Sequence, residues 1–148
     1  MKKLVAVIIV VGLFLSLFPA GAGALGEEGE IAARISGSNR YATAAAISAY
    51  ERSYSGYVVL ARGDHYADAL AGVPLAAMHQ APILLTPKDS LAPEARAEIE
   101  ALSAHTVIIL GGTGAVGSPV EEELAEMGLT VERVKGANRF DTAAAIAE

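Results

Sequence analysis

Two arginines, Arg40 and Arg139, occupy the same position in two copies of one sequence pattern, and their chemistry suits an anionic ligand. The first copy, residues 34–47, reads RISGSNRYATAAAI, and the second copy, residues 133–146, reads RVKGANRFDTAAAI. A guanidinium group can donate two parallel hydrogen bonds to one phosphate or carboxylate group. The pattern therefore predicts an anion-binding arginine that recurs once in each copy.

The residues beside Arg40 extend this prediction. Asn39 and Thr43 form the polar part of the pattern together with the arginine, and we predict that all three contact the anion. A structural role is the alternative, because Asp64 and Asp68 are carboxylates with which Arg40 can form an ion pair inside the fold. Both interpretations stay open on the sequence alone.

The spacing of the two copies predicts how the chain is organised. The copies begin at Arg34 and Arg133, so the period is 133 − 34 = 99 residues. A pattern that returns after such a spacing indicates tandem modules. We predict a complete module at residues 34–132 and the start of a second, truncated module at residues 133–148, after an acidic, glycine-rich linker at residues 25–33.

The segment before the linker, residues 1–24, has the features of a secretory signal peptide. Two lysines precede an apolar run at residues 4–18, and small residues follow in an Ala22-Gly-Ala24 cleavage pattern. A membrane anchor is the alternative, but the run is shorter than the roughly 20 residues that span a bilayer. We predict cleavage after Ala24, which leaves a secreted protein without a membrane segment. The chain has no cysteine, which excludes disulfides and a lipid-anchored lipoprotein.

The net charge argues against a nucleic-acid partner. Without Lys2 and Lys3, 11 − 2 = 9 basic residues stand against 17 acidic residues, so the formal charge is 9 − 17 = −8. A surface of this charge repels a phosphate backbone. We therefore predict that the protein binds no nucleic acid.

Short apolar runs alternate with segments of helical character along the predicted module. The predicted strands are residues 31–36, 57–61, 82–86, 106–110 and 129–134, and the predicted helices are residues 40–50, 69–78, 93–103 and 118–127. The strands are continuously apolar rather than alternating, which is typical of a parallel sheet buried on both faces. We predict an α/β fold, a three-layer sandwich in which helices flank a mainly parallel sheet.

Several residues are predicted to shape the ends of the helices. Gly37 turns the chain before the first helix, which Ser38 or Asn39 caps. Asp68 is predicted to cap the second helical segment or to pair with an arginine. Pro74 removes a backbone donor inside that segment, so we expect a kink or two short helices.

The carboxyl ends of the predicted strands carry further candidate binding residues. Ligands of open parallel sheets usually bind outside these ends. Arg62, Lys88 and Gly112 each follow one of the predicted strands. We predict that they contact the anion together with the arginines of the repeated pattern.

The glycine-rich turn at residues 112–117 also matches the pattern of dinucleotide-binding turns, and Glu132 lies about 20 residues further on at a predicted strand end. The turn leads into a helix that Ser118 is predicted to cap, with Glu121 completing a capping box. A nucleotide-binding Rossmann domain is therefore one alternative, although export removes the protein from the cellular nucleotides. The same turn can favour another anion through its amides and the helix dipole.

Four segments together resemble the cell wall binding repeat 2 family. They are Arg34-x-x-Gly-x-x-Arg-Tyr-x-Thr-Ala44, Val58-Val-Leu-Ala-x-Gly-x-x-Tyr-Ala-Asp-Ala-Leu70, Ala81-Pro-Ile-Leu-Leu85 and Ile108-Ile-Leu-Gly-Gly112. Their order and spacing also resemble those of the family. The resemblance implies a Rossmann-like α/β module that occurs in tandem, typically in three copies, packed around a threefold or pseudo-threefold axis.

The same resemblance implies what the module binds. Members of the family are bacterial, mostly Gram-positive, and their repeats hold a protein non-covalently to an anionic polymer of the cell wall. The repeats stand beside a functional region such as an amidase, a protease or an S-layer domain. For this chain the resemblance implies a secreted cell-surface protein. Its implied partners are the wall polymer and further copies of the module, within one chain or as a homotrimer.

The chain carries no catalytic signature of its own. It has no Gly-x-Ser-x-Gly turn, no cysteine nucleophile and no histidine-glutamate zinc motif. Its histidines, at positions 65, 79 and 105, do not have the spacing of a metal site. We predict a binding module rather than an enzyme, with no cofactor and no metal. The alternative is the targeting part of an exported peptidoglycan-processing enzyme, an amidase or a protease, whose catalytic domain lies outside this chain.

Overall fold

The computed structural model describes residues 34–147, which form six helices and four strands. The helices are α2 (Arg40–Glu51), α3 (Tyr66–Ala71), α4 (Val73–Met78), α5 (Pro93–Ala101), α6 (Ser118–Glu126) and α7 (Arg139–Ala147), and the strands are β1 (Tyr57–Arg62), β2 (Ile83–Thr86), β3 (Thr106–Leu110) and β4 (Thr130–Val134). The predicted signal peptide and linker lie outside the described residues, as does half of the predicted strand at residues 31–36. Its other half, residues 34–36, is not in a strand. Within residues 34–147, no helix has the length and apolar character needed to cross a membrane.

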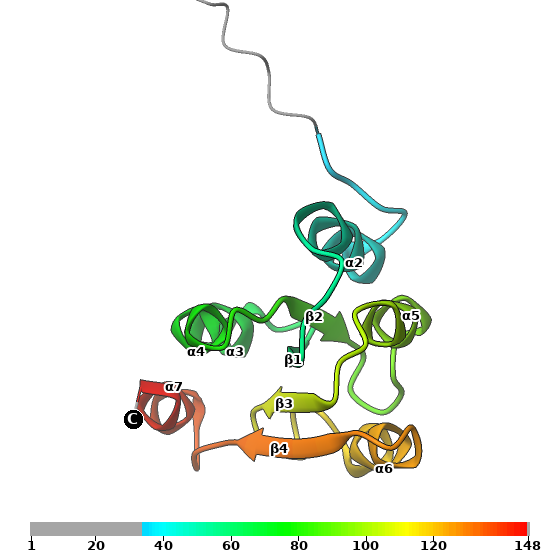
Figure 1. The fold of residues 1–148 in the computed structure, drawn as a ribbon. Helices are drawn as coiled ribbons and strands as arrows, with labels where there is room; N and C mark the ends of the chain where they lie inside the picture. The colour runs from blue at the N-terminus through cyan, green and yellow to red at the C-terminus, as the bar shows by residue number, and fades with distance from the viewer. Residues whose placement is uncertain (1–33, 148) are drawn as a thin grey trace, which may run out of the picture. The chain divides into compact units, whose positions relative to one another are not determined.

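The four strands form one sheet in the order β2-β1-β3-β4, and every pair of neighbours is parallel (Figure 1). Val59 in β1 aligns with Ile83 in β2 and with Ile108 in β3. Helices cover both faces of the sheet, with α5 and α6 on one face and α3, α4 and α7 on the other. The predicted α/β sandwich with a parallel sheet is therefore confirmed.

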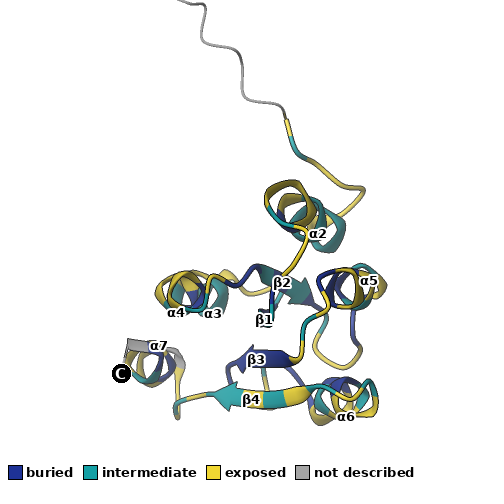
Figure 2. Cartoon of the chain, viewed as in Figure 1, coloured by how far each residue is buried: buried dark blue, intermediate teal, exposed yellow. Residues whose placement is uncertain are grey.

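The two central strands, β1 and β3, bury both of their faces, which explains their largely apolar sequence. Val58 and Leu60 belong to the core beneath α5 and α6, whereas Val59 and Ala61 belong to the core beneath α3, α4 and α7. None of these four side chains is exposed. Figure 2 shows β3 as buried, whereas β4 at the edge of the sheet is intermediate and exposed. A sheet covered in this way leaves its ends, rather than its faces, for a ligand.

Pro74 divides the second helical segment into α3 and α4, as predicted, but the segment starts earlier than predicted. The N-cap residue of α3 is His65, without a side-chain cap hydrogen bond, so Asp68 lies inside the first turn instead of capping the helix. A carboxylate in the first turn still interacts favourably with the helix dipole. The prediction of Asp68 as a cap is wrong because the helix begins directly after the short loop that follows β1.

The start of α6 also differs from the prediction. Gly117 is the N-cap residue and Ser118 is the first helical residue, with no side-chain cap hydrogen bond. Glu121 completes no capping box, because its carboxylate accepts hydrogen bonds from Arg133 instead. The predicted end of this helix is confirmed, since Gly128 follows it with a φ of 82° that favours glycine.

Candidate functional site

Three loops adjoin one another where β1, β2 and β3 end, and we call them the carboxyl edge: residues 62–65, residues 87–90 and residues 111–117. The N–H of Gly117 donates a hydrogen bond to the carbonyl oxygen of Lys88, at 2.7 Å. Arg62 Nη1 donates to the carbonyl oxygen of Gly114, at 3.0 Å. The structure thus places the predicted residues Arg62, Lys88 and Gly112 on linked loops.

Arg40 reaches the carboxyl edge from the start of α2. Its Nη1 donates a hydrogen bond to the carbonyl oxygen of Gly63, at 2.8 Å. The predicted alternative was an ion pair with Asp64 or Asp68, but none of the ion pairs found within residues 34–147 includes Arg40. Arg40 is exposed. It therefore brings a positive charge that no carboxylate of the described chain pairs with.

The recurring glycine, asparagine and threonine build the turn from which α2 starts. Asn39 is the N-cap residue, one of the two predicted candidates, and its Oδ1 accepts a hydrogen bond from the N–H of Ala42, at 2.8 Å. Thr43 Oγ1 donates to the carbonyl oxygen of Asn39, at 2.9 Å, and accepts from the N–H of Gly37, at 3.0 Å. Asn39 and Thr43 thereby position Arg40, and their own contact with an anion stays a prediction.

The second copy of the pattern forms the same turn. The N–H of Gly136 donates to Thr142 Oγ1, at 2.9 Å, and Asn138 Oδ1 accepts an N–H from the first turn of α7, at 2.8 Å. Arg139 then begins α7, just as Arg40 begins α2. The repeated pattern is therefore a repeated local structure that starts a helix with an arginine.

Arg62 is held by a carboxylate on its own loop. Its Nη2 donates to Asp64 Oδ2, at 2.6 Å, and its Nε donates to the other oxygen of the same carboxylate. Hydrogen bonding from Arg62 lowers the pKa of Asp64 to about 2, although desolvation acts in the opposite direction. Because Asp64 stays ionised beside it, Arg62 adds less net charge to the carboxyl edge than Arg40 does.

Replacing Arg62 with glutamine is expected to raise the pKa of Asp64 toward the ordinary aspartate value of about 3.9. The folded-state pKa is lowered to about 2, so the stabilisation from this pair is present above the ordinary value and is lost as the pH falls toward 2. An NMR titration of the Asp64 carboxyl carbon measures this pKa in the wild type and in the variant. Arg96→Gln, which removes an arginine of α5, is the control. An unchanged pKa in Arg62→Gln would contradict the pairing.

Lys88 is a further charged residue of the carboxyl edge, and Asp68 of α3 lies beside it. Lys88 Nζ lies 3.9 Å from Asp89 Oδ1, a loose contact between exposed side chains. Asp68 lies over Gly111, because a Cβ atom on that glycine would be 2.8 Å from Asp68 Oδ2. A small pocket of about 240 Å³ opens between Asp68, Arg62 and the glycine-rich turn. Basic and acidic groups lie side by side at the carboxyl edge. An anion would therefore be recognised by hydrogen bonds from individual groups and not by a large positive surface.

The glycine-rich turn uses part of its own hydrogen-bonding capacity. Ala115 and Val116 donate their N–H groups to the carbonyl oxygen of Gly112, at 2.9 and 3.1 Å. These two amides are not available to hold a phosphate. Glu132 lies in the middle of β4, and its predicted position at a strand end is wrong. Both findings weaken the nucleotide-binding alternative. Gly112 itself is open, since a Cβ atom there would meet no other atom within 4 Å.

Arg133 is the residue of the repeated pattern whose role the sequence did not reveal. Its side chain is 10% exposed, and it donates to the Glu121 carboxylate through Nε and Nη2, at 3.2 and 2.7 Å. Its Nη1 donates to the carbonyl oxygens of Gly111 and Val116, at 2.9 and 3.0 Å. Arg133 therefore fastens both ends of the glycine-rich turn to β4. The available signal was its recurrence, since Arg34 occupies the same position in the first copy.

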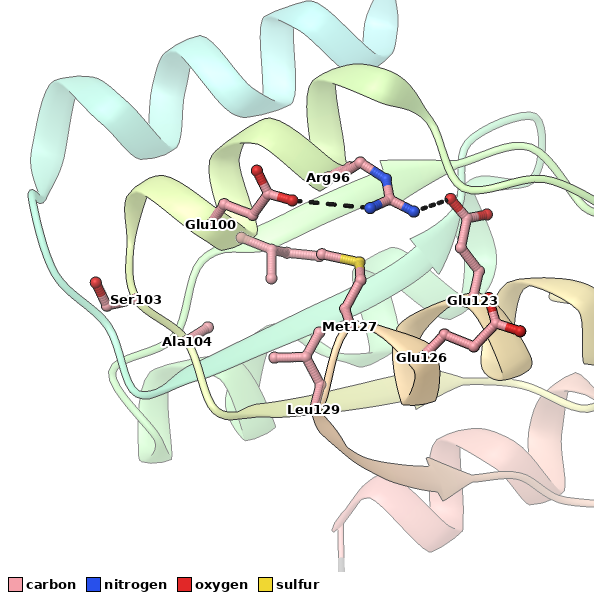
Figure 3. Close-up of a pocket in the computed structure, with 9 residues that line it drawn as sticks. Arg96, Glu100, Ser103, Ala104, Glu123, Glu126, Met127 and Leu129 are labelled. Carbon is pink, nitrogen blue, oxygen red and sulfur yellow. Dashed lines mark hydrogen bonds and ion pairs between the residues drawn. The ribbon is translucent and has the colours of Figure 1, made fainter.

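A second pocket, of about 550 Å³, lies between α5 and α6 near the amino ends of β3 and β4 (Figure 3). Arg96 lies there between two carboxylates, 3.7 Å from Glu100 and 2.5 Å from Glu123. Glu126 adds a further carboxylate, and Met127 lines the apolar side. Because carboxylates outnumber the guanidinium group, this pocket is unsuited to an anion. The carboxyl edge is the better candidate.

Two of the three histidines meet around one tyrosine. The ring of Tyr57 lies 4.7 Å from the ring of His79 and 5.5 Å from the ring of His105, measured between centroids. His65 lies on the carboxyl edge instead. The part of the chain that the structure describes holds no group of three histidine or carboxylate side chains placed to bind a metal ion. The clustered histidines therefore pack against an aromatic ring.

The sequence is similar to known proteins over most of its length. The family model described as cell wall binding domain 2 (CWB2) matches residues 34–121. The chain is 40% identical over 115 residues to the N-acetylmuramoyl-L-alanine amidase LytC of Bacillus subtilis (strain 168). It is 32% identical over 127 residues to the amidase enhancer of the same organism. These matches cover 78% and 85% of this chain but 23% and 18% of the relatives, so the chain spans about a fifth of their length.

The fold is similar to that of two solved structures from Clostridium difficile. Cwp8 matches with a TM-score of 0.73 at 38% sequence identity, over 76% of this chain and 20% of the Cwp8 chain. Cwp6 matches with a TM-score of 0.71 at 32% identity, over 76% of this chain and 18% of the Cwp6 chain. In both structures the similarity of fold is accompanied by sequence identity above 30%.

Proposed function

The chain belongs to the cell wall binding domain 2 family and is a cell-wall-binding module, and from this premise we propose that it anchors its protein to an anionic wall polymer. The anchoring is non-covalent. The carboxyl edge faces the polymer with Arg40, Arg62, Lys88 and the open backbone around Gly112. We propose the same contact for Arg139, because it stands at the equivalent position in the second copy of the pattern.

The observation that carries this proposal is that the guanidinium group of Arg40 has no carboxylate partner among the described residues. Its guanidinium group is oriented by a backbone carbonyl instead of a carboxylate, so it keeps its charge and further N–H donors for a ligand. The helix cap of Asn39 and Thr43 fixes the backbone from which it projects. Bidentate contact with a phosphate or carboxylate is what this arrangement suits.

Binding through several modules can overcome the repulsion between the negatively charged protein and an anionic polymer. The chain after the predicted cleavage site carries a formal charge of 9 − 17 = −8, so long-range attraction to a polyanion is unfavourable. Short-range contacts at each module add up when modules are linked, because later contacts form at a high effective concentration. We propose that further copies of the module, within one chain or in a homotrimer, are partners in binding. The predicted signal peptide supports a secreted, wall-associated location.

Replacing both Arg40 and Arg139 with alanine is expected to weaken retention on purified cell walls about tenfold or more, because charge-assisted hydrogen bonds to the polymer are lost. The mature chain, from Leu25 onward, is incubated with walls before and after acid extraction of their anionic polymers. The bound fraction is then measured over a range of wall concentrations. Wild-type binding that disappears with the polymers would identify their class.

The matched control is Arg96→Ala, which removes one positive charge from the pocket between α5 and α6 instead of the carboxyl edge. It is expected to bind walls as the wild type does. Circular dichroism establishes that each variant is folded. Equal retention of the wild type and the double arginine variant would refute the proposed contact.

The similarity to an amidase supports a second proposal about the whole protein. The match to LytC covers 23% of that relative, which leaves most of its length outside the shared module. We propose that the natural protein also carries a peptidoglycan-processing domain, for which this module supplies targeting. Antibodies against the module would measure the size of the native protein, and a gel containing cell walls would detect lysis at the same position. A band of module size without lysis would refute this second proposal.

A further inference from the structure

Glu98 of α5 is a largely buried carboxylate without a partner in the described part of the chain. The residue is 9% exposed. Within residues 34–147 its carboxylate forms no ion pair and accepts no hydrogen bond, unlike that of the neighbouring Glu94. A charge in such a position is unfavourable unless a counter-charge or hydrogen-bond donors reach it. The carboxylate of Glu98 therefore lacks the partner that its burial calls for.

Two pockets meet at Glu98 and form one groove between α2 and α5, which lie side by side (Figure 1). The pockets have volumes of about 270 and 420 Å³, and Ala49, Glu98 and Ala101 line both of them. Most of the other lining residues are also alanines, and we call the whole the alanine groove. Its alanines are Ala42, Ala45, Ala46, Ala49, Ala97 and Ala101. A ligand in this groove would meet small apolar side chains and one unpaired carboxylate.

The charges of the alanine groove favour a cation. Glu94 lines the groove near the starts of the two helices, and its carboxylate accepts a hydrogen bond from the neutral Asn39 side chain, at 2.8 Å. Arg52 lines the opposite end, but its guanidinium group is already paired with Glu51, at 3.2 Å. Glu94 and Glu98 are therefore both without a counter-charge among the described residues.

We propose that the alanine groove binds a peptide through a primary ammonium group, of the kind that ends a lysine side chain. The ammonium group donates charge-assisted hydrogen bonds to Glu98. Its aliphatic stem packs on the alanine side chains. This ligand has the opposite charge to the anion of the carboxyl edge, and none of the residues of the carboxyl edge lines the groove. The inference therefore does not rest on binding of a wall polymer.

The length of the alanine groove favours a peptide over a free amine. A helix rises about 1.5 Å per residue, so the groove from Ala42 to Ala49 is about 10 Å long. An extended peptide covers this length with about three residues. A small free amine would reach Glu98 but would leave most of the apolar surface uncovered.

Three probes separate the ammonium group from the peptide that carries it. The blocked tripeptide acetyl-Ala-Lys-Ala-amide is titrated into the mature chain, from Leu25 onward, and is expected to shift the amide signals of Ala49 and Ala101 saturably in NMR spectra. The same tripeptide with norleucine keeps the four-carbon stem but has no ammonium group. It is expected to bind about tenfold or more weakly. n-Butylammonium lacks the peptide and is also expected to bind about tenfold or more weakly, because it buries less apolar surface.

Glu98→Gln keeps the size of the side chain and removes its charge. This variant is expected to bind the lysine peptide about tenfold or more weakly than the wild type. Its urea midpoint is expected to stay unchanged, because no bond within residues 34–147 is lost, whereas a structural role of Glu98 would lower the midpoint. Glu100→Gln is the matched control, since Glu100 belongs to the same helix but lines the pocket between α5 and α6. It is expected to bind the peptide as the wild type does.

Ala101→Leu decides the matter if Glu98→Gln does not fold. It leaves the charge of Glu98 in place and fills part of the groove from an exposed position, so binding of the lysine peptide should weaken about tenfold. The inference is overturned if the lysine peptide causes no saturable shifts, or if it binds no more tightly than the norleucine peptide or n-butylammonium. Wild-type affinity in a folded Glu98→Gln or Ala101→Leu chain would overturn it as well.

Discussion

Replacing Arg133 with methionine is expected to lower the free energy of unfolding by about 2–3 kcal/mol. The guanidinium group is 10% exposed and donates to the Glu121 carboxylate and to the carbonyl oxygens of Gly111 and Val116. Methionine keeps most of the apolar stem but leaves both buried carbonyls without this donor. Urea unfolding of the mature chain, followed by circular dichroism, measures the loss.

The control for this prediction is the other arginine that pairs with a glutamate of α6. Arg96 pairs with Glu123, and their side chains are 41% and 32% exposed. Solvent screens such a pair, so Arg96→Met is expected to cost less than about 1 kcal/mol. Equal losses in Arg96→Met and Arg133→Met would mean that the carbonyl contacts of Arg133 add no stability.

The effect of Arg133 should extend to the carboxyl edge. Arg133 holds the two ends of the glycine-rich turn, and Arg62 is bonded to Gly114 in the middle of that turn. Loosening the turn therefore frees one of the anchors of Arg62. Arg133 is thus a residue of the repeated pattern that supports the candidate site through the glycine-rich turn.

The sequence predicted the features that depend on neighbours along the chain. Residues 106–110 are mostly apolar and β-branched, and β3 has the predicted bounds. Asn39 caps α2 because its side chain needs only the next helical turn. Pro74 divides its segment because the missing N–H is a local property. Such features require no knowledge of what lies across the sheet.

Other features of the structure depend on the order of the strands, and the sequence did not predict them. Glu121 was predicted to complete a capping box, but β4 lies beside β3 and brings Arg133 within reach of its carboxylate. The burial of Ile146 also follows from the packing of α7 on α3 and α4. The repeated sequence revealed that two helices are alike, but it could not tell that each buries a different side.

Replacing Gly37 with alanine is expected to lower the free energy of unfolding by about 1–3 kcal/mol and to reduce wall binding in the chain that remains folded. A Cβ atom at this position would lie 2.5 Å from the backbone carbon of Ala42 and 2.6 Å from the backbone nitrogen of Thr43. The contact is with backbone in the first turn of α2, so it is relieved only if the start of the helix moves. Arg40 projects from that turn and would move with it.

Gly112→Ala separates this effect from the general cost of losing a glycine. A Cβ atom on Gly112 would meet nothing within 4 Å, so its alanine variant is expected to stay within about 0.5 kcal/mol of the wild type. Urea unfolding is measured on both variants, and the wall pull-down compares Gly37→Ala with the wild type. Loss of binding in Gly37→Ala at temperatures where it is folded would mean that the glycine acts through the position of Arg40. Unfolding and wall binding of Gly37→Ala that match those of the wild type would show instead that the turn tolerates a side chain and that the recurring glycine has another role.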